Sequence, residues 1–420
     1  MSTLILGSGI AGISAAYHLK KQGRPSVILE KDNDWGGLCS SFCLNGFRFD
    51  RFVHFSFAPD GDTQQLFCPA AGMYEHAPAC SNYYHGTWLK HPAQNNLFPL
   101  SAAEKFKIIA GFVCRPRLAP EKISDYATWL RAQYGRYFAE HFPFVYTRKY
   151  WGLPAQDLET KWVGVRMNTP SLKQVLQGAL KEPTKNFYYT SVMRYPKKGG
   201  FRAILNKCRE GLTIACNKEV IAIEPANKTV TCKDGTQTSY TRLISTLPLP
   251  EIVNMLPNVP PDVRQAAGQL RWTCGYQISL GFNRPDVAKH LWFYIYDEDI
   301  PPARIYSPNL KSPDNVPPGC SSLQAEVFFD CRTPFPPAQE VLAKTLTKLQ
   351  AIGLFTDKDI VVQDIRFEKY ANITFVPDIY KNRQIVRDYL AAQGIESIGR
   401  FGRWEYFWTH QAFSDGKTVI

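Results

Sequence analysis

Two groups of residues have the types and spacing that binding chemistry needs. The first is a run of glycines that ends a short apolar stretch, with Gly7, Gly9 and Gly12 in the pattern Gly-x-Gly-x-x-Gly. Gly7 allows a tight turn, Gly9 lets the backbone approach a pyrophosphate, and Gly12 lets a helix pack closely on a strand. The free N–H groups at the start of that helix, around Ile10 and Ala11, would hold the phosphates. The pattern therefore predicts a dinucleotide site.

An acidic residue follows at the distance that such a site requires. Residues 26–30 read Ser-Val-Ile-Leu-Glu, so Glu30 lies eighteen positions after Gly12. A carboxylate at the end of this second strand can accept both hydroxyl groups of a ribose. Glycines at this spacing also mark ordinary turns, but the flanking strand and helix and the spaced acid favour a dinucleotide. We therefore expect Glu30 and its neighbour Lys31 to bind the ligand.

The second group interleaves aromatic and cationic residues between positions 144 and 166. Rings can stack on a nucleobase or sugar, while guanidinium groups fork onto a diphosphate. Large aromatic side chains more often pack in a core. We favour a substrate site for Trp151 and Arg166. Both interpretations stay open for the other members of the group, which are Tyr146, Arg148, Lys149, Lys161 and Trp162.

The residues after Glu30 resemble a large FAD family. Residues 35–41 read Trp-Gly-Gly-Leu-Cys-Ser-Ser, which is similar to the Gly-Gly segment of amine oxidases, protoporphyrinogen oxidases and UDP-galactopyranose mutases. Residues 47–55 resemble the Phe-x-x-Asp-x-Gly-x-His stretch of these families, in which the chain passes over the isoalloxazine, although residues 51–53 read Arg-Phe-Val where a glycine is usual. Without the resemblance, the glycines could form a plain turn and the histidine could lie in the core. The resemblance implies FAD and contacts from Gly36, Gly37, Leu38 and His54.

Further segments are similar to UDP-galactopyranose mutases in particular. Residues 89–96 resemble their Tyr-Pro-x-Gln-Asn segment, and residues 144–152 match their Tyr-Thr-x-Lys-x-Trp-Gly motif. Residues 162–166 stand where the mutases have Arg-x-Pro-x-Arg, with only Arg166 kept. Tyr370 lies where they have a tyrosine that touches the substrate diphosphate. Arg304 fits an anion clamp or a surface arginine about equally.

Two more segments resemble FAD contacts of the same group. Residues 397–406 are similar to the Gly-Arg-x-Gly-x-Tyr-x-Tyr motif that closes the FAD site, which implies contacts from Gly399, Arg400 and Trp404. Val220, at the start of a strand, is assigned to the adenine side through backbone groups. Residues 409–413, Thr-His-Gln-Ala-Phe, replace the Asp-Met-Asp that is usual in mutases.

The order of the elements predicts an α/β fold in which one Rossmann-type (GR2-like) FAD-binding domain is interrupted. We expect this domain to comprise residues 1–56, 190–250 and 390–420. A largely helical substrate region would occupy residues 57–189, where Ser101 and Glu104 form a capping box before a helix through about Phe112. Strands of period two between 276 and 328 predict an antiparallel-sheet substrate region at residues 251–389. Asp-Gly at 234–235 marks a hairpin.

Composition narrows the function further. A chain of 420 residues with 45% hydrophobic and 20% charged residues is globular and should contain more than one structural unit. The net charge of +12 favours anionic ligands such as phosphates, but the scattered lysines and arginines and the lack of zinc-ligand spacing argue against nucleic acid and a metal site. Eleven cysteines without a Cys-x-x-Cys pair fit a reducing compartment, so we expect a cytoplasmic protein.

No stretch of eighteen apolar residues occurs, so the sequence predicts no transmembrane segment. An aromatic content of 13% together with the positive charge leaves room for a peripheral membrane contact, but a wet, aromatic substrate cleft explains both equally well. No pattern in the sequence points to an oligomeric state.

Three functions agree with these patterns. The first is an enzyme that resembles UDP-galactopyranose mutase, in which flavin N5 attacks the anomeric carbon of a nucleotide sugar; it needs a flavin and cations for the diphosphate. The second is an oxidase or dehydrogenase of the protoporphyrinogen or amine oxidase type, whose cleft should be apolar with few cations. The third is a flavin-binding protein without catalysis. Arg166, Lys149 and Arg304 favour the first.

Overall fold

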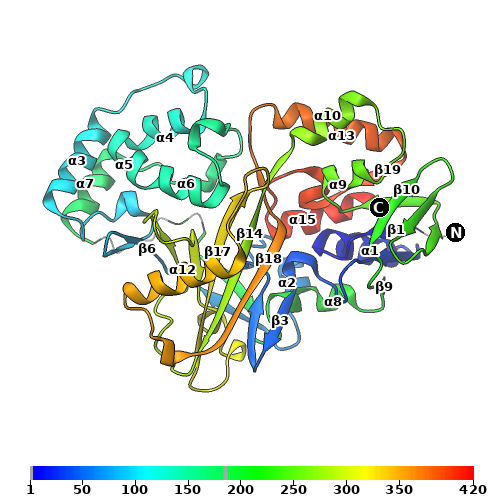
Figure 1. Ribbon diagram of the computed structural model, residues 1–420, viewed down its shortest axis with the longest axis horizontal. Coiled ribbons are helices and arrows are strands. Elements are labelled where there is room, and N and C mark those ends of the chain that lie inside the picture. Colours follow the sequence, from blue (N-terminus) through cyan, green and yellow to red (C-terminus); the bar gives the residue numbers. More distant parts are fainter. Residues whose placement is uncertain (1–2, 183–187, 189) are drawn as a thin grey trace.

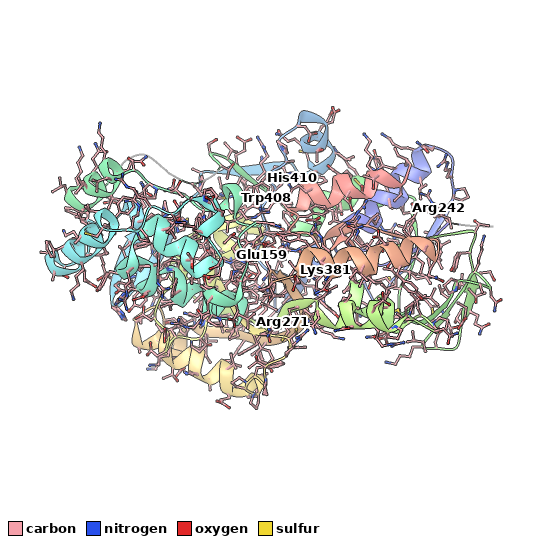
Figure 2. The ribbon with its side chains drawn as sticks, turned by 90° about the horizontal axis from the view of Figure 1, so that it is seen from above. Glu159, Arg242, Arg271, Lys381, Trp408 and His410 are labelled. Atoms are coloured by element: carbon pink, nitrogen blue, oxygen red, sulfur yellow. The ribbon has the colours of Figure 1, made fainter. Side chains whose placement is uncertain are left out.

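The computed structural model describes residues 3–182, 188 and 190–420 (Figure 1). Helices α3 to α7 lie at one end of the long axis, a large sheet occupies the middle, and both termini lie with α1 at the other end. The domain boundary predicted between residues 189 and 190 falls at residue 189, which lies outside the described residues. Figure 2, at right angles to this view, shows Glu159 and Trp408 in the middle of the molecule, between the two ends.

A five-stranded parallel sheet forms the nucleotide-binding unit at the end of the molecule that holds the termini. Its order is β19-β13-β1-β2-β9. The strands are Thr3–Leu6 (β1), Ser26–Leu29 (β2), Thr213–Ala215 (β9), Arg242–Ser245 (β13) and Ile395–Ser397 (β19). The central strand β1 is buried and apolar, as a strand covered on both faces requires. Because the strands are parallel and α1 (Ile10–Lys21) follows β1, the predicted Rossmann-type fold is confirmed.

Smaller elements surround this sheet. A three-stranded antiparallel sheet contains Val220–Glu224 (β10), Thr229–Cys232 (β11) and Gln237–Ser239 (β12), which confirms the hairpin predicted at residues 234–235. Helix α1 packs against α15 (Thr409–Gly416), and α10 (Pro261–Gln269) packs against α13 (Ile379–Ala392). The other helices of the unit are Asn206–Arg209 (α8), Leu249–Asn254 (α9) and Gly399–Arg403 (α14).

A seven-stranded sheet forms the middle of the molecule, in the order β18-β14-β17-β16-β15-β6-β7. Its strands are Cys80–Tyr84 (β6), Thr87–Lys90 (β7), Arg271–Phe282 (β14), Trp292–Ile295 (β15), Arg304–Tyr306 (β16), Ser321–Asp330 (β17) and Ile360–Thr374 (β18). All neighbours are antiparallel except β15 and β6. The predicted antiparallel sheet is therefore present. The segment 57–189, expected to be largely helical, also contributes β6 and β7 to it, because β6 pairs with a strand more than 200 residues later.

The helical lobe consists of five helices. They are Ala102–Val113 (α3), Tyr126–Tyr134 (α4), Arg136–His141 (α5), Pro143–Trp151 (α6) and Leu172–Leu180 (α7). The predicted capping box starts α3: Ser101 Oγ accepts the N–H of Glu104, and the Glu104 carboxylate accepts the N–H of Ser101. Helix α6 packs against β17 and so joins the lobe to the seven-stranded sheet.

The other strands and α-helices of the described residues lie outside these groups. They are the strands Ser41–Leu44 (β3), Phe47–Asp50 (β4), Met73–His76 (β5) and Met193–Pro196 (β8), and the helices Gly61–Phe67 (α2), Pro308–Lys311 (α11) and Ala338–Ala351 (α12). Among the described residues, none of the helices has the length and apolar content that a membrane crossing demands.

Candidate functional site

The glycine loop has the geometry of a dinucleotide cradle. Gly7 has φ +92°, the left-handed region, and a Cβ on it would overlap Thr246 Oγ1. A Cβ on Gly9 would meet no atom of the described chain within 4 Å, so the backbone there is open to a ligand. Gly12 abuts the carbonyl of Gly7, which is the close helix-strand packing expected of it. Helix α1 starts at Ile10 without a side-chain cap, so its first N–H groups face this opening.

The predicted partners of the loop lie beside it. Gly36 N–H donates to the Ser8 carbonyl at 3.1 Å, and a Cβ on Gly37 would lie 3.1 Å from Gly9 Cα. A Cβ on Gly399, at the start of α14, would lie 2.6 Å from that of Ala11. Three segments far apart in sequence thus meet at the N-terminus of α1.

Glu30 follows β2 and is buried next to the same loop. Its Oε2 accepts the Ser8 N–H at 2.8 Å, and its Oε1 accepts the Asp32 N–H at 3.0 Å. Lys218 N–H donates to the Glu30 carbonyl, which brings the segment that leads into Val220 alongside. Lys31 is exposed. The position of Glu30 agrees with a ribose contact, and that of Val220 agrees with a contact on the adenine side. Both contacts stay predictions.

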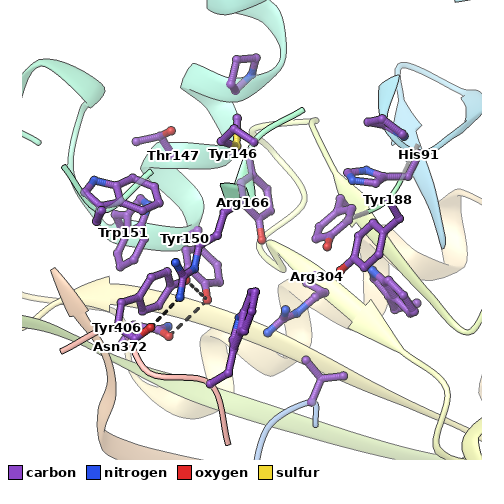
Figure 3. Close-up of a pocket in the computed structure, with 18 of the residues that line it drawn as sticks. His91, Tyr146, Thr147, Tyr150, Trp151, Arg166, Tyr188, Arg304, Asn372 and Tyr406 are labelled. Atoms are coloured by element: carbon purple, nitrogen blue, oxygen red, sulfur yellow. Dashed lines mark hydrogen bonds between the residues drawn. The ribbon is translucent and has the colours of Figure 1, made fainter. Parts of the chain in front are cut away.

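A cavity of about 670 Å³ lies between the nucleotide-binding unit, the helical lobe and the seven-stranded sheet (Figure 3). Leu38 and His54, expected at the isoalloxazine, line it, as do the expected substrate residues Trp151, Arg166 and Arg304. The loop at residues 52–57 forms part of the wall. The structure therefore places residues predicted to contact the flavin and residues predicted to contact the substrate around the same cavity.

His54 is held as a neutral imidazole. Burial lowers its pKa to about 4, and its ring stacks on Phe201 with centroids 4.9 Å apart. The residue two positions earlier, Phe52, has φ +62°. Phe52, one of the residues that stand where the resembled motif has a glycine, thus adopts a left-handed backbone conformation that favours glycine. Its ring lies 5.8 Å from that of Phe328 in the cavity wall.

Arg304 is neutralised by a carboxylate that the sequence did not reveal. Its guanidinium lies 2.6 Å from Glu326 on β17, whose side chain is fully buried. Burial alone would lower the pKa of Arg304, but the Glu326 carboxylate outweighs this and raises that pKa. Glu326 Oε1 also accepts the Val53 N–H at 3.0 Å, so one carboxylate fixes both the arginine and the loop before His54. The available signal was a glutamate between the apolar residues Ala325 and Val327 of a period-two strand.

Arg166 and Arg400 reach the cavity without a carboxylate partner among the described residues. Arg166 donates to the Tyr406 carbonyl at 2.6 Å, and its guanidinium lies 4.4 Å from the Tyr406 ring. Arg400 donates to Asn372 Oδ1 at 2.9 Å, while its Nε is buried with no hydrogen-bond partner in the described chain. Burial lowers the pKa of Arg400. Because these contacts place its guanidinium in the cavity wall, Arg400 is also within reach of a substrate diphosphate there. Its predicted contact with the FAD pyrophosphate stays a prediction.

Aromatic rings surround these cations. Tyr150 donates to Asn372 Oδ1 at 3.2 Å, and its ring is 4.9 Å from that of Trp151. Trp151 is only 3% exposed, so most of its surface packs against its aromatic neighbours and only an edge meets the cavity. Figure 3 shows Tyr150, Tyr406 and Asn372 grouped around Arg166. Tyr150, Tyr406 and Asn372 were not predicted as site residues, although the first two belong to recognised motifs.

Two predicted contacts are corrected by the structure. Trp404 has no exposed surface and packs edge-on to Trp272, so it belongs to the core and cannot touch a cofactor. Tyr370 does not line the cavity; it stacks on Trp272 and donates to Glu251 at 2.8 Å. A bulge in the pairing of β18 with β14 lies just there, and a bulge re-aims side chains relative to strict alternation. Asn372 faces the cavity instead.

Lys149 of the aromatic-cationic group is structural. Its ammonium donates to the carbonyls of Ile295 and Asp297, both at 2.9 Å, and thereby ties α6 to the end of β15. Burial lowers the pKa of Lys149 to about 7, although the Asp297 carboxylate acts to raise it. Arg148 forms an exposed ion pair with Glu298. Neither is among the residues that line the cavity.

Solved structures share this fold along almost the whole chain. A reduced UDP-galactopyranose mutase superposes with a TM-score of 0.91 at 23% identity, covering 99% of this chain and 94% of that one. A putative protoporphyrinogen oxidase from Exiguobacterium sp. 255-15 gives a TM-score of 0.75 at 17% identity, covering 100% and 97%. At these identities the likeness is one of fold.

Curated relatives match only short segments. A 1-hydroxycarotenoid 3,4-desaturase from Flavobacterium sp. (strain P99-3) is 34% identical over 109 residues, which is 24% of this chain and 22% of that protein. An inactive all-trans-retinol 13,14-reductase from Danio rerio is 42% identical over 50 residues, 12% and 8% of the two chains. The chain thus matches less than a quarter of the length of these relatives.

Two family descriptions match the chain itself. Residues 5–68 match the NAD(P)-binding Rossmann-like domain. Residues 110–378, well over half of the chain, match the flavin containing amine oxidoreductase family. With the glycine cradle, the buried Glu30 and the cavity beside His54, the matched residues fit a flavin dinucleotide. The chain belongs to the flavin-containing amine oxidoreductase family and is an FAD-dependent enzyme.

Proposed function

We propose that the protein acts on a nucleotide sugar or a related glycan precursor, with flavin N5 chemistry at the anomeric carbon, as in UDP-galactopyranose mutases. Arg166 and Arg400 carry this proposal, because they bring two positive charges into one cavity and no carboxylate of the described chain neutralises either. Two such guanidinium groups would bind a diphosphate far better than an uncharged substrate.

Each part of the cavity has a role in this proposal. A flavin held by the glycine loop and the residues near His54 would supply a nucleophilic nitrogen for the reaction. Arg166 and Arg400 bind the diphosphate and stabilise the negative charge that grows on it as the glycosidic bond weakens. The rings of Tyr150 and Tyr406 give sugar and base an aromatic surface, and Trp151 packs behind the ring of Tyr150. His54, neutral at pH 7, adds no charge beside the flavin.

Glu326 does not act as a base in this scheme. Its carboxylate is fully buried and is engaged by both Arg304 and the Val53 N–H. A carboxylate whose two oxygens are held by a guanidinium and a backbone donor is fixed in place and already has hydrogen-bond partners. It therefore orients Arg304 and the loop before His54 rather than taking a proton from the substrate.

A second function, an FAD-dependent oxidase or dehydrogenase of the protoporphyrinogen or amine oxidase type, is favoured by a different observation. The Arg304–Glu326 pair is neutral, and most of the remaining wall is aromatic. The partial match to a carotenoid desaturase agrees with an apolar substrate. Such an enzyme would use the flavin to accept a hydride.

One experiment separates the two. Dithionite-reduced protein is incubated with UDP-hexopyranoses and the sugar is analysed by NMR, while oxidised protein is assayed in air for peroxide with amines and porphyrinogen. The mutase proposal expects an isomerised sugar without net oxidation. Peroxide release without isomerisation would contradict it and support the oxidase.

Arg166→Ala removes one of the two arginines on which the proposal rests. We expect UDP-sugar binding to weaken by about 2–4 kcal/mol, roughly 30- to 700-fold, because a buried charge contact is lost. FAD content, read from the flavin absorbance, should not change. Arg284→Ala, which removes an exposed arginine paired with Asp286, is the matched control and should bind as wild type. Equal binding by Arg166→Ala and wild type would exclude Arg166 from the substrate site.

We also propose that the protein works in the cytoplasm. All eleven cysteines are free, and Cys39, beside the glycine loop, is buried with its pKa raised to about 12. Such thiols behave as small apolar side chains of a reducing compartment.

A further inference from the structure

Helices α3 and α7 carry an unusual share of the exposed apolar surface. Twelve large apolar side chains are exposed among the described residues, and half of them lie on these two helices or just before α3. They are Phe98, Phe106, Val113, Leu172, Leu176 and Leu180. Phe106 is 74% exposed and Leu180 is 78% exposed, whereas most exposed apolar residues elsewhere are near 40–50%. We call this set the α3–α7 face.

The spacing on α7 shows that its leucines form one stripe. Leu172, Leu176 and Leu180 follow at intervals of four residues, which places them along one side of the helix. The opposite side is buried: a Cβ on Gly178 would overlap the Asn95 carbonyl. Helix α7 is therefore docked by its small residues and turns its leucines outward. It packs beside α3, and both helices lie at the same end of the molecule in Figures 1 and 2.

Cations accompany this apolar stripe. Lys107, Lys173, Lys181 and Arg117 are exposed, and none forms a salt bridge with another described residue. Lys105 lies over the ring of Phe98, with its ammonium 5.5 Å from the centroid. Glu104, the acid on α3, is engaged by the capping box. Glu182, just after α7, is an exposed acid next to the leucine stripe, but the lysines and arginines on and beside the two helices outnumber the acids.

We propose that the α3–α7 face docks onto the surface of an anionic lipid bilayer. Leucine and phenylalanine side chains would enter the boundary between headgroups and acyl chains, and the flanking lysines would meet the lipid phosphates. A second copy of the chain is a poorer occupant, because a self-complementary interface would bring the same lysines together in a protein that already carries +12. An anionic surface instead neutralises them.

The same elements join this face to the cavity. Asn168 and Thr169 line the cavity, and α7 begins three residues after Thr169. Gln94 donates to the Asn168 carbonyl at 2.9 Å, and the adjacent Asn95 abuts Gly178 of α7. Docking through α7 would therefore place this cavity wall close to the lipid headgroups.

The test is flotation of the purified FAD-bound protein with vesicles of phosphatidylcholine alone or with about one third phosphatidylglycerol. We expect wild type to float with the anionic vesicles only, and to be released as salt approaches about 1 M, where surface charges are screened. Leu180→Glu and, separately, Phe106→Glu should lower the vesicle-bound fraction about tenfold. Flavin absorbance reports that each variant is folded.

Val361→Glu is the matched control, since it makes the same charge change at a 47% exposed apolar residue of β18, away from this face. It should float as wild type does. Wild type that stays unbound to anionic vesicles, or face variants that bind as well as Val361→Glu, would overturn the proposal. So would a wild-type dimer that Leu180→Glu splits without any vesicle binding, which would identify a second copy as the occupant.

Discussion

Gly9 is one of the glycines at which an added Cβ would meet no atom of the described chain within 4 Å. Its backbone caps the first turn of α1, where the phosphates of a dinucleotide would lie. Gly12, three residues later, has no comparable freedom because the Gly7 carbonyl lies against it. A substitution at position 9 therefore probes the cofactor, and one at position 12 probes the fold.

We expect Gly9→Val to keep its fold and lose FAD. The valine fits the protein but fills the space that the pyrophosphate needs. The measurement is the flavin absorbance per mole of purified protein, with circular dichroism as the check on folding. Gly9→Ala, with a smaller side chain, should retain a part of the flavin. Stoichiometric FAD in Gly9→Val would place the pyrophosphate elsewhere.

Phe52 is a second residue at which backbone and side chain conflict. Its φ of +62° favours glycine by about 1 kcal/mol, while its ring packs against Phe328. Removal of the ring costs packing in both Phe52→Ala and Phe52→Gly, but only glycine relieves the backbone. We therefore expect Phe52→Gly to be about 1 kcal/mol more stable than Phe52→Ala, as measured by urea unfolding. The opposite order, which is usual elsewhere, would show that the backbone relaxes.

At the scale of elements, the contact between α6 and β17 positions the aromatic wall of the cavity. Gly152 ends α6 with φ +66°, and a Cβ there would overlap the backbone nitrogen of Asp330 on β17. Tyr150 and Trp151 stand immediately before it. The distance between helix and sheet is thus set by the absence of a side chain.

Gly152→Ala should move α6 away from β17. We expect a loss of unfolding free energy of about 2–4 kcal/mol, from overpacking and a strained φ. Substrate affinity should fall as well, because Tyr150 and Trp151 shift. Calorimetry and substrate titration measure the two effects. Gly164→Ala, at a glycine with similar φ and open space around its Cβ, is the control for strain alone.

Local patterns predicted the elements well. The capping box at Ser101 fixes the start of α3, Asp-Gly at 234–235 forms its hairpin, and the glycine loop sits between β1 and α1. Each of these signals acts between residues close in sequence. The prediction was weaker where a contact joins distant residues.

The site shows this limit directly. Arg304 was recognised as a cation, but its neutralisation by Glu326 depends on the pairing of β16 with β17. Trp404 belongs to an FAD motif, yet its ring packs on Trp272 more than 130 residues earlier. A bulge in β18 changes which side chains face the cavity, so that Asn372 lines it and Tyr370 does not. Tertiary pairing decided each of these positions, and a motif alone does not encode it.

At the scale of the whole molecule, the nucleotide-binding sheet is assembled from distant parts of the chain. β1 pairs with β2 on one side and with β13 on the other, and β19 adds to β13 near the end of the chain. Gly399 and Arg400 follow β19 directly. The predicted cradle for FAD is therefore assembled from residues as far apart in the sequence as Gly7 and Gly399.

We expect a fragment of residues 1–394 to retain no FAD although it contains the complete glycine loop. Without β19 and α14, the edge of β13 and the start of α1 lose their cover. Addition of residues 395–420 as a separate chain should restore flavin absorbance. A fragment 1–394 that holds FAD at unit stoichiometry would show that α14 does not close the site.

The split sheet also sets the timing of maturation on the ribosome. β2 emerges soon after β1, but β19 is synthesised more than 360 residues later. At bacterial to eukaryotic elongation rates this gap lasts roughly 20 to 70 s. During it β13 lacks its neighbour β19, and the start of α1 lacks the cover of α14. FAD can therefore meet the complete cradle only after β19 and α14 have been synthesised.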